Sequence, residues 1–174
     1  ETLKNRIRED MKAREEKRVD RELKKRILDK IGATVNVDLP ETLVESEMRY
    51  AVETVKQNLL RMGSSLEKSG LTEEKVREDF RVASERRVKD LLILGEIARL
   101  NDLSLSEIEV EEGFADLAKG MGQDPKVIRQ YYEAKGLLEG LRDRLLEEKT
   151  LNYLVKGAKI RDIEATRIKD APQG

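Results

Sequence analysis

The feature that most constrains the fold of this chain is the spacing of its apolar residues, which recur every three or four positions over long stretches. The clearest stretch follows Pro40 and contains Val44, Met48, Ala51, Val55, Leu59 and Met62. Residues with this spacing lie on one face of an α-helix, whereas those of a half-buried strand alternate with polar residues. Only three prolines interrupt the 174 residues, which are rich in Leu, Glu, Lys and Arg. We therefore expect an all-α fold.

Residues that favour helix ends divide the chain into six expected helices. Thr72, the Ser106–Glu109 pair and Asp124 before Pro125 each offer a side-chain oxygen to the free N–H groups at a helix start. The expected helices cover residues 1–32, 40–62, 73–100, 107–121, 125–135 and 137–158.

The first of these helices has few apolar residues, and they recur mostly every four positions. Such a stripe winds around the helix instead of staying on one face. Residues 1–32 hold twelve Lys or Arg and eight Asp or Glu, and the helix would be about 45 Å long. We expect a projecting or connecting helix with a solvated surface, ending at Gly32; an anionic partner is the alternative. Pro40 is expected at the first position of the next helix.

The segment Leu91–Leu94 is apolar in every direction, which predicts a buried turn of helix at the centre of the core. Gly95 follows it and is unfavourable inside a helix, so we expect another helix to cross closely there. Near the end of the chain, residues 159–163 alternate like a short strand. Residues 164–174 are polar and are expected to form a flexible tail.

Composition excludes several classes of function. The chain has no Cys and no His, so thiolate and imidazole catalysis and the usual zinc sites are excluded. Its net charge of -1 and its six aromatic residues argue against direct nucleic-acid binding. No apolar run approaches the length of about 18 residues that a membrane helix needs. We found no catalytic, cofactor or metal motif, and we expect no enzyme activity, cofactor or metal site in this chain.

The first ten residues, ETLKNRIRED, are charged and do not form the apolar segment of a secretion signal. They also lack an initiator Met. We expect the chain to be a piece of a longer protein.

Five segments in order resemble the C-terminal domain of bacterial trigger factor, and the resemblance covers residues 2 to 163. They are LPETLVESEM, LTEEKVREDF, ERRVKDLLILGEIA, GQDPKVIRQYYE and LRDRLLEEKTLNYLVKGAKI. The resemblance implies an elongated helical body with two protruding arms. Within a domain at 1–163, residues 1–32 would be a connecting helix. Residues 40–102 would form the body and one arm, and residues 106–158 the second arm and a return helix.

The resemblance also implies a function. The family is a ribosome-associated, ATP-independent chaperone of the bacterial cytoplasm that holds nascent or unfolded polypeptides between its arms. Its ribosome-docking domain and its FKBP-like prolyl isomerase domain have no counterpart in this sequence. Ribosome contact and isomerase activity would therefore belong to the parent protein.

An apolar surface on the arms is the expected binding site. Met is flexible and suits surfaces that must adapt to different partners, although apolar residues at helical spacing also form cores. The family's apolar contacts near the QDP segment correspond to Ile128 and Tyr131, and Gly122 stands where relatives often have an aromatic residue. The candidates for contact with a client are Met48, Val52, Leu59, Met62, Phe114, Leu117, Met121, Ile128, Tyr131 and Tyr132.

Other hypotheses remain open from the sequence. The chain could be a coiled-coil or oligomerisation module, and a homodimer is compatible with either function. A SurA-type periplasmic chaperone domain has a related helical architecture. A nucleic-acid role for the basic helix at 1–32 would show as salt-dependent binding.

Overall fold

The computed structural model describes residues 2–159, and it confirms the all-α fold. It contains six α-helices and one short 3-10 helix, and these residues include no strand. The elements are α1 (Thr2–Thr34), α2 (Glu41–Arg61), η1 (Glu67–Ser69), α3 (Glu73–Leu100), α4 (Glu107–Met121), α5 (Pro125–Ala134) and α6 (Leu138–Gly157). The strand-like pattern at 159–163 lies outside the described residues from position 160 on, and so does the predicted tail.

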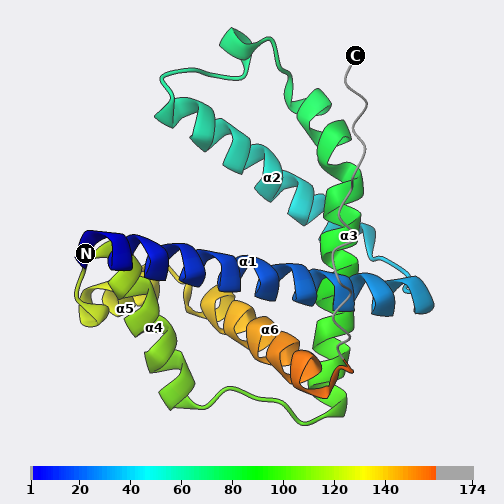
Figure 1. Cartoon of the computed structure of the whole chain (residues 1–174). Helices are drawn as coiled ribbons and strands as arrows, with labels where there is room; N and C mark the ends of the chain where they lie inside the picture. The colour runs from blue at the N-terminus through cyan, green and yellow to red at the C-terminus, as the bar shows by residue number, and fades with distance from the viewer. Residues whose placement is uncertain (1, 160–174) are drawn as a thin grey trace, which may run out of the picture.

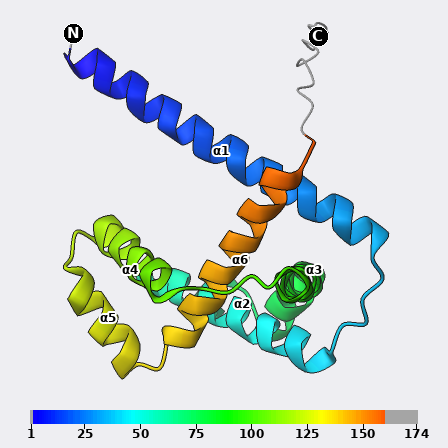
Figure 2. The same ribbon diagram turned by 90° about the horizontal axis from the view of Figure 1, so that it is seen from below.

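Helix α3 is the central element, and α1, α2 and α6 contact it (Figure 1). It pairs along its first half with α2, and its second half contacts α1 and α6. Helices α4 and α5 form a second hairpin, from which α6 returns to α3. Figures 1 and 2 together show α2 and the α4–α5 hairpin on the same side of α3.

The predicted helix ends are largely confirmed. The Thr72 side chain accepts a hydrogen bond from the Lys75 N–H, and Ser106 forms the predicted capping box with Glu109. Asp124 likewise caps α5. These caps provide acceptors for N–H groups that have no partner within the helix.

Two predicted ends are wrong by one or two residues. Helix α1 continues past Gly32 to Thr34, because the Val35 N–H still bonds to the Ile31 carbonyl and Lys89 binds the Gly32 carbonyl at 2.7 Å. Pro40 precedes α2 instead of starting it. Its backbone is extended, and its carbonyl accepts the first helical hydrogen bonds.

Most of α1 is solvated, as predicted for a projecting helix. Residues 4–22 are all exposed. The C-terminal part is held to the body by polar contacts, in which Lys24 pairs with Glu148 of α6 and Arg86 of α3 pairs with Asp29. Lys24 also pairs with Asp20 at 2.7 Å. The Lys24 side chain is only 10% exposed, so its ion pairs are the most enclosed ion pairs of α1 among the described residues.

Two separate apolar clusters stabilise the fold. One joins α2 to α3 through Val44, Met48 and Val88. The other joins α4, α5 and α6 through Val110, Phe114, Ala118, Ile128 and Leu141. The two clusters share no residue, so each hairpin has a core of its own.

The predicted centre of the core is only partly enclosed. Ile93 and Leu94 are buried, but Leu91 and Leu92 are half-buried because neighbouring helices do not surround α3 completely. The close crossing predicted at Gly95 is wrong, since a Cβ atom there would meet no atom within 4 Å. The close approach occurs at Gly113 of α4, where a Cβ would lie 2.7 Å from Leu145 Cδ1 of α6.

The capping box of α4 predicts a pH dependence of stability. The pKa of Glu109 is lowered to about 2, first because Lys149 donates a hydrogen bond to its carboxylate and then because the Ser106 N–H and hydroxyl do so. This pKa lies below the ordinary value of 4.5, so these bonds stabilise the fold above pH 4.5. Their contribution is lost as the pH falls from 4.5 to about 2.

Glu109→Gln is therefore expected to lower stability near neutral pH and to flatten its decline over this acid interval. The measurement is the thermal unfolding midpoint against pH. Glu112→Gln is a matched control, because Glu112 is exposed on the same helix and its side chain has no hydrogen bond or ion pair within residues 2–159. An unchanged acid profile in Glu109→Gln would contradict the assignment.

Candidate functional site

The apolar stripe of α2 is covered at the base of its hairpin and open at the tip. Val44 and Met48 are buried, Leu59 is half-buried, and Met62 at the end of the helix is 80% exposed. At the base, α3 lies against the stripe, and Arg81 pairs with Glu41 at 3.0 Å beside it. Toward the tip the described helices no longer cover the same face, so an apolar surface remains accessible.

The stripe of α4 changes in the same way. Val110 and Phe114 are sealed in the cluster with α5 and α6, and Leu117 is half-buried. Met121, the last residue of the helix, is 57% exposed. Each hairpin therefore carries one continuous apolar stripe that is core at one end and surface at the other.

A methionine followed by a glycine ends both stripes. Gly63 after Met62 has φ of 72°, and Gly122 after Met121 has φ of 65°. Left-handed backbone at this position ends a helix and is favourable for glycine. Each methionine thus lies at a turn, and its flexible side chain can adapt to apolar groups of different shape.

Helix α5 adds a second apolar face to the second hairpin. Tyr132 is half-buried, and its ring packs edge-on against Phe114 with the ring centroids 5.7 Å apart. Tyr131 next to it is 54% exposed, and so is Val127 four residues earlier on the same side of the helix. Tyr131 and Val127 therefore form a second exposed apolar pair on this hairpin.

The structure corrects four of the ten predicted contact residues. Met48, Val52, Phe114 and Ile128 are buried, with at most 5% of each residue exposed, so they are unavailable to a partner in this conformation. They are buried because they occupy the covered parts of the two stripes and of α5. A charge at Ile128 would therefore disrupt the fold, so that position is unsuitable for testing binding.

The other six predicted residues remain compatible with contact. Leu59, Leu117 and Tyr132 are half-buried, and Met62, Met121 and Tyr131 are exposed. The prediction omitted several exposed apolar residues of the same hairpins, among them Leu43, Tyr50, Leu60 and Val127. The sequence carried a signal for three of these residues. Leu43 and Tyr50 are seven positions apart, and Val127 is four positions before the predicted Tyr131, which places each pair on one helix face.

The exposed side chains of the two hairpins are suited to binding apolar groups. No group of three or more metal-ligating side chains occurs among the described residues. No helix in that part of the chain is long and apolar enough to span a bilayer. The helices of the two hairpins expose methionine, tyrosine and aliphatic side chains.

Comparison with known proteins identifies the family. A family model described as the C-terminus of bacterial trigger factor protein matches residues 1–156. This chain therefore belongs to the trigger factor C-terminal family.

Individual relatives agree with this assignment. The trigger factor of Halothermothrix orenii is 31% identical over 160 residues, covering 90% of this chain and 37% of the relative. The trigger factor of Bartonella quintana is 32% identical over 149 residues, covering 85% and 32%. That of Bartonella tribocorum is 33% identical over 145 residues, covering 83% and 30%. The chain thus spans about a third of the length of these relatives.

Proposed function

We propose that this chain is a chaperone module that holds apolar segments of unfolded or nascent polypeptides without ATP. The observation that carries the proposal is that the apolar stripes of α2 and α4 are uncovered at their ends, at Met62 and Met121. Membership of the trigger factor C-terminal family supports it. Helix α2 and the α4–α5 hairpin lie on the same side of α3, so one extended client can contact both hairpins.

The physical mechanism is reversible burial of apolar surface. At about 25 cal/mol per Å², covering a few hundred Å² yields several kcal/mol before the cost of ordering the client. After that cost, an affinity of about micromolar is expected, which permits release. Charged residues flank the stripes and remain hydrated, which limits nonspecific association.

The activities of a longer protein are a separate part of the proposal. Ribosome docking and prolyl isomerisation would belong to other domains of a bacterial trigger factor. The present chain would contribute client binding, in the bacterial cytoplasm. It would act as a binding module and not as an enzyme.

The test is to place charges at both tips. Met62→Asp combined with Met121→Asp is expected to weaken binding of reduced, carboxymethylated α-lactalbumin at least about tenfold, because each change puts a carboxylate in the apolar contact. Fluorescence anisotropy of the labelled client measures the affinity. Circular dichroism is expected to show unchanged helicity, since both residues are exposed.

The matched control is Val82→Asp combined with Ile108→Asp, which adds the same charge. These residues are 76% and 72% exposed and lie outside the two stripes. Equal losses in the two double variants would indicate a general charge effect and contradict the assignment to the tips. A concentration-dependent assembly that binds no client would instead favour an oligomerisation module.

A further inference from the structure

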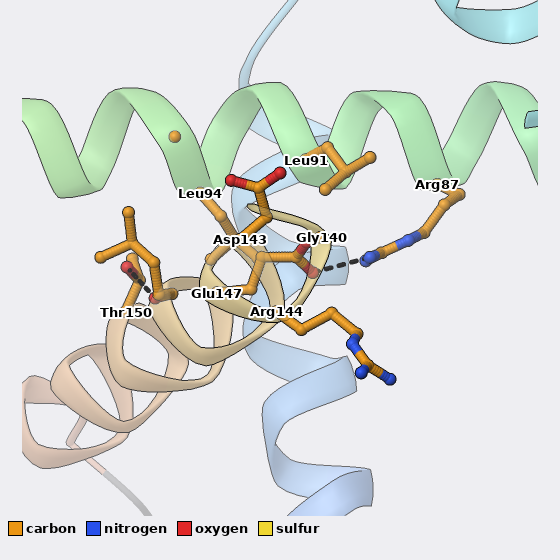
Figure 3. A pocket seen from close by; sticks show the side chains of 10 residues that line it. Arg87, Leu91, Leu94, Gly140, Asp143, Arg144, Glu147 and Thr150 are labelled. Atoms are coloured by element: carbon orange, nitrogen blue, oxygen red, sulfur yellow. Dashed lines mark hydrogen bonds and ion pairs between the residues drawn. The ribbon is translucent and has the colours of Figure 1, made fainter. Parts of the chain in front are cut away.

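A pocket of about 310 Å³ lies between α3 and α6 (Figure 3). Its apolar lining comes from Leu91 and Leu94 of α3 and from Leu146 of α6. Gly95 and Gly140 also line it, one from each helix. The volume is at the small end of the range of about 300–1,000 Å³ found for ligand pockets, which suits a single large side chain.

The two glycines have no structural reason to be glycine. Neither has a positive φ, and a Cβ atom at either position would meet no atom within 4 Å. Glycine inside a helix is less stable than alanine, most clearly for Gly95, which is well inside α3. A side chain at either position would occupy the pocket. Sequence choices that lower stability without a structural need are typical of functional sites.

The charges around the pocket favour a neutral occupant. Arg87 Nη2 and Glu147 Oε2 are 2.7 Å apart and neutralise each other, as the dashed line in Figure 3 marks. Asp143 and Arg144 point in different directions and have no ion-pair partner within residues 2–159. Two cations and two anions give a free ion no net attraction. A peptide, however, can donate its N–H to Asp143 and accept from Arg144.

Residues next in sequence to two of the pocket leucines pack against the apolar clusters of the two hairpins. Leu92, beside Leu91, packs against the α2–α3 cluster, and Leu145, beside Leu146, packs against the α4–α6 cluster. Figures 1 and 2 place the contact of α3 with α6 at the base of the two projections. A polypeptide that reaches from the tips to this base can therefore contact the pocket.

We propose that this pocket binds one aromatic or branched aliphatic side chain of the unfolded polypeptide held by the hairpins. This inference rests on the proposed chaperone function and adds a defined subsite to it. The two glycines keep the space free, the leucines contact the side chain, and the polar rim accepts the flanking peptide backbone. The hairpin tips then supply adaptable contacts, and the pocket supplies one of fixed shape.

The test fills the pocket from either helix. Gly95→Leu and, separately, Gly140→Leu are expected to weaken binding of a neutral Gly/Ser/Asn peptide with widely spaced Phe residues about tenfold, the effect of losing one buried side chain. The thermal unfolding midpoint is expected to stay the same or rise, because leucine is a better helix former than glycine. Gly157→Leu is the control, since it adds the same side chain into open space outside the pocket.

Methyl NMR gives an independent readout on the unaltered chain. Titration with the Phe peptide is expected to shift the methyl signals of Leu91, Leu94 and Leu146, and a peptide with Ala in place of Phe is expected not to. Unchanged peptide affinity in both pocket variants, with binding still lost in the Met62→Asp and Met121→Asp double variant, would overturn the pocket alone. Failure of the unaltered chain to bind the Phe peptide or α-lactalbumin would overturn the chaperone proposal itself.

Discussion

Replacing Phe114 by alanine is expected to lower the free energy of unfolding by about 3–5 kcal/mol, the range for truncating a buried aromatic residue. Phe114 has no exposed surface and is central to the cluster of α4, α5 and α6. Its ring contacts Tyr132 edge-on, and the Arg129 guanidinium lies 5.9 Å from the ring centroid. The substitution removes these contacts and leaves a cavity. Urea unfolding followed by circular dichroism measures the loss.

Phe80→Ala is the matched control, because Phe80 of α3 is 39% exposed and belongs to neither cluster. Its truncation is expected to cost about 1 kcal/mol, since less apolar surface returns to water. Hydrogen exchange is expected to show that Phe114→Ala exposes amides of α4 and α5 while those of α2 stay protected. Equal costs for the two substitutions would contradict the burial of Phe114.

Val88→Asp is expected to have an effect of similar size on the other hairpin. Val88 is 2% exposed and packs with Val44 and Met48 between α2 and α3. An aspartate there would be an uncompensated buried charge, for which a cost of about 3–5 kcal/mol is typical. This is a large part of the total stability of about 5–15 kcal/mol expected for a domain. Loss of helical signal and of protected amides in α2 measures the effect.

Val82→Asp is the matched control. It makes the same substitution on the same helix, at a position that is 76% exposed. It is expected to change stability by no more than about 0.5 kcal/mol. If Val88→Asp were equally mild, α2 would not be held to α3 by this cluster. If it unfolded α4 and α5 as readily as α2, the two hairpins would not be the separate cooperative units that their separate cores predict.

The helices themselves are largely predictable from local chemistry. The spacing of Val44, Met48 and Leu59 gives the helical face, and capping residues such as Thr72 and Ser106 fix the starts within a residue. The helical face and the helix start both depend on residues that are close in the sequence. They can therefore be predicted without knowing the tertiary arrangement.

The division of each stripe into core and surface is not predictable in this way. Met48 and Met62 occupy the same stripe and look equivalent in the sequence, yet one is buried and the other exposed. The difference depends on where α3 covers α2, which is a matter of hairpin geometry. For the same reason Gly95 suggested a helix crossing, whereas the structure puts open space there and the close approach at Gly113.

Under the proposed function, the connection of the two hairpins through α3 and α6 has a consequence for client release. Two weak contacts on a shared support act at a high effective concentration, so a polypeptide engaging both is retained far longer than one engaging a single tip. This longer retention is lost as soon as folding of the client buries either of its two apolar segments. The client's progress toward its native state would then set the time of departure, with no external energy source.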